Sequence, residues 1–483
     1  MDVKVISSYV GKALLVSALF MVISAGISVF DGVDSAFTPL VISGGITLLV
    51  GAFPLIFVRK TPEVNLKDGF LIIVLSWLLS FLFGMLPYVL WGGEFTIVNA
   101  WFESVSGYTT TGSSILNDVE ALPRSLLFWR SSTHFIGGLG VVVFLLLVLP
   151  SASPYRLRLT NIEMSTLSRE GYRYKSSKTV LVITSVYLGI TILCTLSFWA
   201  AGMTFFDAIN HSFSVAATGG FSTNNLSLMH YDSNLIYAIA MIFMTLSAMH
   251  FGTIFSVLAT RSLKPINNPI FKYYIGSIIV FSALVAFSLK TDGHVATWGE
   301  AFMNGSFNVI SYMCTTGLAN TATSQWPTLA SVILIFVSFQ CGCAGSTTGG
   351  IKVDRIVIAL KSFASEIRHR IYPSSVSSVR LGRHLLPDNV VKSIFIYIFL
   401  YIVVILISSL LLIGIGVDLV EAVSGTIASL GNVGMGVSSL GSFGSFSSQT
   451  TFAKIIYSLN MFLGRLEIYP ILVVVSLLVR RGR

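Results

Sequence analysis

Apolar segments that are long enough to cross a lipid bilayer recur along the whole chain. A transmembrane helix needs about 20 mostly apolar residues to cross a hydrocarbon core of roughly 30 Å. Only 11% of the 483 residues are charged, whereas soluble domains carry about 25%. The sequence therefore predicts an all-α polytopic membrane protein. We expect ten spans, over residues 8–30, 36–58, 68–91, 125–150, 178–202, 234–260, 271–289, 326–346, 390–415 and 452–479.

The net charge of +9 reflects where the basic residues stand relative to these spans. With the N-terminus inside, nearly all Lys and Arg fall on the cytoplasmic side, while acidic residues dominate the outer connections. This positive-inside bias predicts that both termini are cytoplasmic. It also accounts for the excess charge, so we expect no nucleic-acid partner. The basic exceptions are Arg124, Arg130, Lys290, Lys454 and Arg465.

Four shorter apolar segments lie between the spans, and each ends in a polar turn with a glycine. They read NAWFESVSGYTTTGSS, FDAINHSFSVAATGGFSTNN, NGSFNVISYMCTTGLANTA and LVEAVSGTIASLGNVGMGVSS. The glycines Gly112, Gly219, Gly317 and Gly434 are 107, 98 and 117 residues apart, which is too long for a solenoid repeat. The pattern predicts four pseudo-repeated helix–pore loop–helix units around one central pore, preceded by two N-terminal transmembrane helices.

These repeats give the expected domain organisation. The two N-terminal helices occupy residues 1–62, and the third repeat includes an additional intramembrane loop. The four repeats are expected at 63–155, 156–262, 263–370 and 371–483.

Irregular backbone at membrane depth is unfavourable, because each unpaired polar group there costs several kcal/mol. The pore loops are therefore expected to have a function that uses their backbone polar groups. Replacing the hydration shell of a monovalent cation with a ring of carbonyl oxygens is such a function. Thr110 and Thr111 would supply carbonyls, and Gly112 would allow the backbone to turn them toward the axis. The alternative is that the glycines only let helices pack closely. The candidate filter residues are Thr110, Thr111, Gly112, Ala217, Thr218, Gly219, Thr315, Thr316, Gly317, Asn432, Val433 and Gly434.

The loops contain no ring of acidic residues, which favours K⁺ as the transported ion over Ca²⁺. We expect no bound cofactor. A secondary transporter that couples K⁺ or Na⁺ to another ion is the alternative, although such proteins are typically built from inverted or half-chain repeats. No nucleophile–base arrangement, HExxH motif or nucleotide-binding P-loop is present, so we expect neither an enzyme nor a nucleotide site.

The stretch FQCGCAGSTTGGIKVDRI should interrupt a helix. Four glycines fall within residues 342–350, and each costs about 1 kcal/mol against Ala in a helix interior. Basic residues mark the cytoplasmic edge just beyond, so we expect a non-helical loop under the filter; the alternative is a surface loop after an early helix end. The candidate gate residues are Gly342, Gly345, Ser346, Thr347, Thr348, Gly349 and Gly350.

Arg465 stands midway along an apolar run, where a cationic side chain is costly and usually faces a cavity, a partner or a pathway. The alternative is an ion pair with Glu467 or Glu421 that only fixes packing. We assign no role to His211 or His250.

Several motifs together resemble the TrkH, TrkG and KtrB superfamily of bacterial potassium uptake proteins. They are FESVSGYTTTGSS, LFWRSSTHFIGGLGVVV, GCAGSTTGGIKVDRI and MFLGRLEIYPILVV. The two additional N-terminal spans make the resemblance closest to TrkH. The loops AATGG and NVGMG depart from the usual pattern, so the resemblance does not imply strict exclusion of Na⁺.

The resemblance implies a gated K⁺ uptake pore in a bacterial inner membrane, as the membrane subunit of a Trk-type system. It also implies that residues 342–350 form a gating loop and that Arg465 helps to obstruct the pore. The implied partners are a second copy of the chain, as a homodimer, and a cytosolic ring of nucleotide-binding TrkA-like subunits. Basic stretches at 156–178 and 352–383 would also meet anionic membrane lipids.

Overall fold

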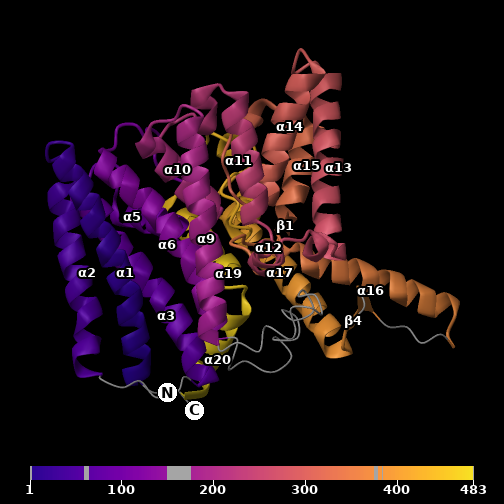
Figure 1. The fold of residues 1–483 in the computed structure, drawn as a ribbon, viewed down its shortest axis with the longest axis horizontal. Coiled ribbons are helices and arrows are strands. Elements are labelled where there is room, and N and C mark those ends of the chain that lie inside the picture. Colours follow the sequence, from indigo (N-terminus) through magenta and orange to yellow (C-terminus); the bar gives the residue numbers. More distant parts are fainter. Residues whose placement is uncertain (1–2, 59–64, 149–175, 375–378, 383, 482–483) are drawn as a thin grey trace.

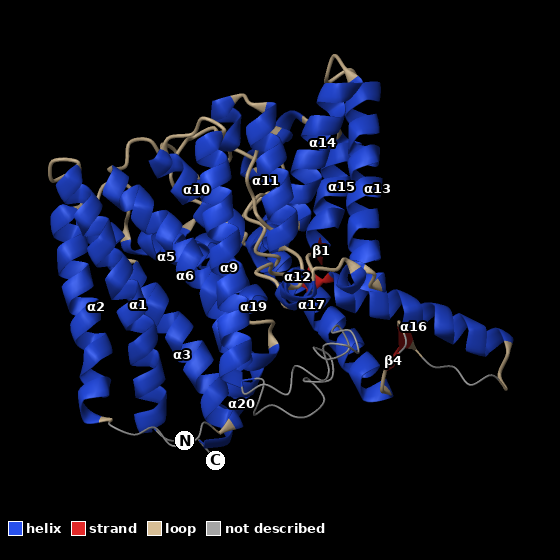
Figure 2. Ribbon diagram, in the orientation of Figure 1, coloured by secondary structure: helices blue, strands red, loops and turns tan. Residues whose placement is uncertain are grey.

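The computed structural model describes residues 3–58, 65–148, 176–374, 379–382 and 384–481. Most helices run side by side, and the first and last helices have their terminal ends on the same face (Figure 1). Helices dominate the described chain, and its strands are two short pairs of two residues each (Figure 2). The protein is therefore all-α, as predicted.

Two N-terminal helices form a hairpin beside the remaining helices. α1 spans Val3–Phe30 and α2 spans Phe37–Phe57. They approach closely, since a Cβ built on Gly11 would lie 2.5 Å from the carbonyl oxygen of Gly51. The hydroxyl of Tyr108 donates to Ser17 Oγ at 2.8 Å, which attaches the hairpin to the first repeat.

The rest of the chain repeats one pattern four times: a long helix, a short helix, a loop and a second helix. The first repeat contains α3 (Leu66–Gly84), α4 (Leu86–Trp91), α5 (Ile97–Tyr108) and α6 (Arg124–Val148). The second contains α9 (Ser176–Ala200), α10 (Phe205–Ala217), η1 (Ser227–Tyr231), α11 (Asn234–Ser247) and α12 (Phe251–Thr260). The third contains η2 (Lys264–Ile266), α13 (Pro269–Thr291), α14 (Trp298–Met313), η3 (Thr323–Gln325), α15 (Thr328–Phe339), β1 (Gln340–Cys341), β2 (Ile351–Lys352) and α16 (Val353–Ile371). The fourth contains β3 (Arg380–Leu381), β4 (His384–Leu385), α17 (Asp388–Gly414), α18 (Leu419–Leu430), η4 (Ser438–Leu440), α19 (Thr451–Arg465) and α20 (Tyr469–Arg481).

The short helices α5, α10, α14 and α18 begin with the same device. In each, the residue before the first turn accepts a hydrogen bond from a backbone N–H of that turn through its side chain. Such N-caps stabilise a helix by about 1 kcal/mol. The four N-cap residues are Thr96, Thr204, Thr297 and Asp418.

The expected spans are only partly continuous helices. Six helices in the described part of the chain are long and apolar enough to cross a membrane, and two more spans result if each bent pair counts as one. α11 and α12 meet at 99°, and α19 and α20 meet at 102°, so continuous spans over 234–260 and 452–479 were wrong predictions. The expected span 326–346 also ends early, because α15 stops at Phe339.

Local chemistry explains both bends. His250 caps α12, because its Nδ1 accepts from the backbone N–H of Thr253 at 3.2 Å. At the second bend Glu467 and Ile468 adopt φ of 60° and 59°, which no α-helix accommodates. Pro470 then falls in the first turn of α20, where its missing N–H is tolerated.

Apolar packing brings the first and fourth repeats together. One large cluster of buried side chains combines residues of α1–α6 with residues of α18–α20. A second large cluster fills the second and third repeats. The repeats therefore follow one another around a centre, and the fourth returns to the first.

Two expected repeat boundaries, at 62/63 and 155/156, lie outside the described residues, as does most of the basic stretch 156–178. The boundary at 370/371 falls at the end of α16, which projects sideways from the bundle (Figure 1).

Candidate functional site

All four short helices end in the same hydrogen-bonded turn. After α5 the N–H of Thr110 donates to Gly107 O at 3.0 Å, and the N–H of Thr111 donates to Ser106 O at 2.9 Å. These two bonds form a Schellman motif, which places one residue in the left-handed conformation. That residue is Thr110, Thr218, Thr315 or Asn432, with φ of 52°, 55°, 52° and 54°.

Left-handed backbone is rare for a β-branched residue and is concentrated at functional sites. Three of the four residues in this position are threonine. The repetition of this conformation in four loops therefore makes them the first candidate site.

A glycine with positive φ follows each left-handed residue by two positions. These glycines are Gly112, Gly220, Gly317 and Gly434, with φ of 85°, 90°, 72° and 86°. The expected register was therefore wrong by one residue in the second loop, where Gly219 occupies the position of Thr111. Ala217 is the last residue of α10 and lies before the loop.

The four loops contact one another in a closed ring. A Cβ built on any of the four positive-φ glycines would come closer than 3.0 Å to a carbonyl oxygen of the next loop, a separation that real Cβ atoms essentially never show. Only glycine therefore fits these positions without displacing the neighbouring backbone. Gly112 faces Gly219 O, Gly220 faces Thr316 O, Gly317 faces Val433 O and Gly434 faces Thr111 O. One chain thus surrounds one axis with four equivalent carbonyl groups.

Side chains fasten the first loop to the fourth. Ser113 Oγ donates to Gly434 O at 2.9 Å, and Asn432 Nδ2 donates to Thr111 Oγ1 at 2.9 Å. The same amide also reaches Met461 O of α19 at 2.9 Å. The ring is therefore closed by specific hydrogen bonds as well as by backbone contact.

Outside the ring, Asn225 connects the segments that follow the first two loops. Its Nδ2 donates to Asp118 Oδ1 at 2.8 Å, and its N–H donates to Glu120 Oε1 at 3.0 Å. The hydrogen bond from Asn225 is the main reason that the pKa of the exposed Asp118 carboxyl is lowered. The lowered pKa keeps the Asp118 carboxylate negative, and a negative group at this position attracts cations.

The segment between α15 and α16 is a largely buried, non-helical loop. Its two ends meet, because β1 pairs with β2 in parallel. Gly345 is exposed, whereas Ser346, Thr347 and Thr348 are at most 2% exposed, so most of the segment is buried rather than on the surface.

This segment, the intramembrane loop (residues 342–350), lies against the C-terminal ends of α10, α14 and α18. Thr347 Oγ1 donates to Ala216 O at 3.1 Å, and the N–H of Gly349 donates to Thr315 Oγ1 at 3.3 Å. A Cβ on Gly349 would lie 2.6 Å from Gly431 O. The loop thus touches the second, third and fourth repeats directly beside the ring.

Two buried cations hold the loop through its carbonyl oxygens. Arg465, 4% exposed, donates from Nη1 to Thr347 O at 2.6 Å and from Nη2 to Gly137 O at 3.2 Å. Lys352, 6% exposed, donates from Nζ to Thr348 O.

The alternative packing role for Arg465 required an acidic partner in Glu467 or Glu421. Glu467 pairs instead with Arg355 at 2.5 Å, and Glu421 accepts from Gln449 Nε2 at 3.1 Å. The importance of Lys352 was missed in the sequence, where it only marked the cytoplasmic edge. Its position directly after the glycine run was the available signal.

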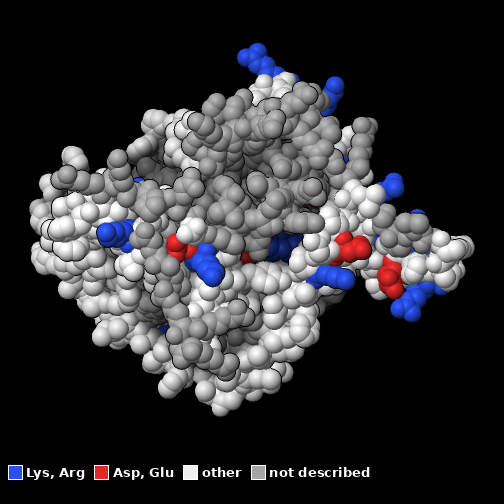
Figure 3. All heavy atoms as spheres, turned by 90° about the horizontal axis from the view of Figure 1, so that it is seen from below, with Lys and Arg blue, Asp and Glu red and all other residues white. Residues whose placement is uncertain are grey.

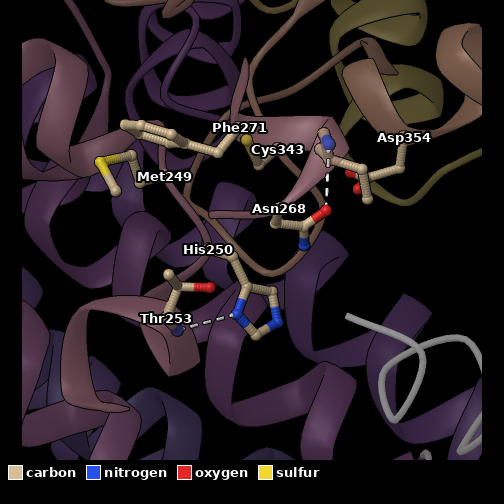
Figure 4. A pocket seen from close by; sticks show the side chains of 8 residues that line it. Met249, His250, Thr253, Asn268, Phe271, Cys343 and Asp354 are labelled. Carbon is tan, nitrogen blue, oxygen red and sulfur yellow. Dashed lines mark hydrogen bonds between the residues drawn. The ribbon is translucent and has the colours of Figure 1, made fainter. Parts of the chain in front are cut away.

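A small pocket lies where the intramembrane loop begins. Figure 4 shows Met249, His250, Asn268, Cys343 and Asp354 around it. Here the α11–α12 break is joined to the loop, because the N–H of Cys343 donates to Ala248 O at 2.8 Å. Among the described residues, no group of three His, Cys, Asp or Glu side chains could hold a metal ion.

These features define a polytopic membrane protein in which four re-entrant loops surround one axis and an intramembrane loop lies beneath them. The sequence model of the TrkH family, described as a cation transport protein, matches residues 40–482. The chain belongs to the TrkH family, and it is a transporter rather than an enzyme.

Known relatives cover nearly the whole chain. It is 34% identical over 483 residues to the Trk system potassium uptake protein TrkH of Escherichia coli K12, covering 98% of each chain. It is 34% identical over 425 residues to TrkG of the same strain, covering 86% of this chain and 85% of that one. The crystal structure of the potassium transporter TrkH from Vibrio parahaemolyticus superposes with a TM-score of 0.88 at 31% identity, covering 98% of both chains.

Proposed function

We propose that the protein is the membrane subunit of a Trk-type potassium uptake system and conducts K⁺ through a gated pore. The names of its relatives supply the ion. The observation that carries the pore mechanism is the closed ring of four equivalent loop carbonyls in one chain. Each repeat expected at 63–155, 156–262, 263–370 and 371–483 contributes one loop to this ring.

The ring acts as the selectivity filter. Carbonyl oxygens replace the hydration shell of K⁺ as it passes, and the left-handed residue and the glycine of each loop set the direction of these carbonyls. The filter residues in the corrected register are Thr110, Thr111, Gly112, Thr218, Gly219, Gly220, Thr315, Thr316, Gly317, Asn432, Val433 and Gly434.

The intramembrane loop acts as the gate. It fills the space beside the C-terminal ends of α10, α14 and α18, and Arg465 and Lys352 hold its carbonyls in place. Conduction then requires the loop to move away from the axis. Because the loop continues into α16, displacement of that projecting helix would reach the gate directly.

The protein works in a bacterial inner membrane with both termini in the cytoplasm. The face on which the chain ends lie carries more basic than acidic side chains in the view from below (Figure 3), as a cytoplasmic face should. On this face the protein meets anionic lipids and a TrkA-like nucleotide-binding ring, and two copies associate as a homodimer.

Purified protein in proteoliposomes tests the proposal. We expect K⁺-loaded vesicles to take up tracer Rb⁺ without a pH gradient, driven by the K⁺ diffusion potential. Uptake should stop when K⁺ is added outside the vesicles, because this removes the potential. Strictly proton-coupled, saturable uptake would instead support a secondary transporter, and no K⁺ or Rb⁺ uptake would contradict the proposal.

A further inference from the structure

A buried ion pair lies directly behind the first two loops. Glu103 in α5 and Arg130 in α6 are 0% and 2% exposed, and Arg130 Nε lies 2.7 Å from Glu103 Oε1. Removing two charges from water is expensive, so such a pair persists only when further hydrogen bonds satisfy its remaining polar atoms.

Glu103 uses both carboxylate oxygens on the segment that follows the first loop. Ser114 Oγ donates to Oε1 at 3.0 Å, and the backbone N–H of Ile115 donates to Oε2 at 3.1 Å. The carboxylate therefore fixes the backbone just outside Gly112.

Arg130 connects this segment to the equivalent segment of the second loop. Its Nη2 donates to Ser114 Oγ at 3.2 Å, and its Nη1 donates to Ser222 O at 3.3 Å. Ser114 and Ser222 each stand two residues after the positive-φ glycine of their loop. The guanidinium also lies 3.8 Å from the centre of the Phe221 ring.

The other repeats carry no carboxylate at the position of Glu103, seven residues before the left-handed residue. His211 Nε2 bonds Ser222 Oγ at 2.9 Å, and Asn308 Nδ2 donates to Asn320 Oδ1 at 2.9 Å. Gly425 occupies this position in the fourth repeat. In three repeats the side chain at this position thus forms a hydrogen bond with the segment that follows the loop. Only in the first repeat does this position carry an ion pair that joins two loops.

We propose that the Glu103–Arg130 pair is a strut that fixes the spacing between the first and second loops and thereby sets the preference for K⁺ over Na⁺. Both are positioning residues, because they contact the loop backbone behind the carbonyl ring. A ring that discriminates by the number and direction of its carbonyls loses selectivity when neighbouring loops shift. The inference rests on the proposed pore function.

Two variants test the strut by the ratio of K⁺ to Na⁺ permeation in proteoliposomes. Arg130→Lys keeps the charge but loses the planar fork that reaches both loops. The double variant Glu103→Gln with Arg130→Gln leaves no unpaired charge and provides the test if Arg130→Lys does not fold. We expect each to retain K⁺ uptake while the ratio falls by at least about tenfold, which is the effect of losing a single charged hydrogen bond.

Arg124→Lys is the matched control, because Arg124 lies in the same helix and pairs with Asp31 at 3.2 Å while 55% exposed. Its permeation ratio should equal that of the wild type. Wild-type ratios in both strut variants would overturn the strut and leave the pore function intact. A wild-type protein that conducts no K⁺ would overturn the pore function and the strut with it.

Discussion

Nη1 of Arg465 donates to the carbonyl oxygen of Thr347 at 2.6 Å, although the two residues are 118 positions apart in the chain. Arg465 is the last residue of α19, and Thr347 lies in the intramembrane loop. The contact therefore joins the broken second helix of the fourth repeat to the irregular segment of the third. Both interruptions are costly inside a membrane, and they occur where they meet each other.

Replacing Arg465 with Ala should increase Rb⁺ flux in the absence of any cytosolic partner. A hydrogen bond from a charged group contributes about 1.5–3 kcal/mol, and 1.4 kcal/mol corresponds to about a tenfold change in an equilibrium. We therefore expect uptake into proteoliposomes to rise about tenfold or more. Arg124→Ala, on the exposed surface of α6, serves as the control. Unchanged flux in a well-folded Arg465→Ala protein would place the gate elsewhere.

Lys352→Met should also increase flux, and its effect should depend on Arg465. The Lys352 ammonium donates to Thr348 O, next to the carbonyl that Arg465 holds. Because Met fills a similar volume without a buried charge, the fold should tolerate the change. Two groups that hold the same segment couple, whereas independent sites add within about 0.5 kcal/mol. Flux in the two single variants and the double variant measures this coupling, and simple additivity would mean that the two cations act on separate elements.

The lengths of the apolar segments and the low content of charged residues predicted the membrane fold well, because they depend on local composition. The span breaks at 248–250 and 466–468 were not predictable in the same way. At the first break His250 is the N-cap of α12. At the second break Glu467 and Ile468 adopt positive φ although neither is a glycine, so the sequence does not indicate the break. These breaks depend on packing against the intramembrane loop, which hydropathy does not report.

The positive-φ glycine of the second loop is Gly220, one residue after the glycine expected from the sequence. In the sequence ATGG either glycine could follow the helix end, and the choice depends on which residue adopts the left-handed conformation. The repeated Thr or Asn at Thr110, Thr218, Thr315 and Asn432 was the better guide to the register. The pairing of Glu103 with Arg130 was also missed, although both are charged residues in apolar segments of one repeat.

Gly434→Ser should relax the selection of K⁺ over Na⁺. A Cβ at this position would collide with Thr111 O of the neighbouring loop, and its φ of 86° disfavours any side chain. We expect a fall in the K⁺/Na⁺ permeation ratio while the protein remains inserted. Gly276→Ser in α13 is the control, because nothing lies within 4 Å of a Cβ there. An unaltered ratio in Gly434→Ser would argue against a carbonyl filter at this ring.

Gly219→Ala should be tolerated once His134 is also replaced by Ala, whereas Gly220→Ala should not. Gly219 stands where Thr111, Thr316 and Val433 stand in the other loops, so its backbone accepts a side chain. The obstacle is the ring of His134, which a Cβ on Gly219 would meet closer than 3.0 Å. Gly220 has a φ of 90°, and its Cβ would instead meet the backbone oxygen of Thr316.

Both substitutions are compared in the His134→Ala background, which lacks the imidazole ring. Because that ring stacks on Phe221 with the centroids 4.1 Å apart, His134→Ala alone is the reference for the thermal midpoint and for Rb⁺ uptake. Adding Gly219→Ala to this background should change neither the thermal midpoint nor Rb⁺ uptake appreciably. Adding Gly220→Ala should lower both, because backbone cannot be displaced as a side chain can. Equal losses for the two glycines in this background would contradict the assignment of Gly220 alone to the glycine position of the ring.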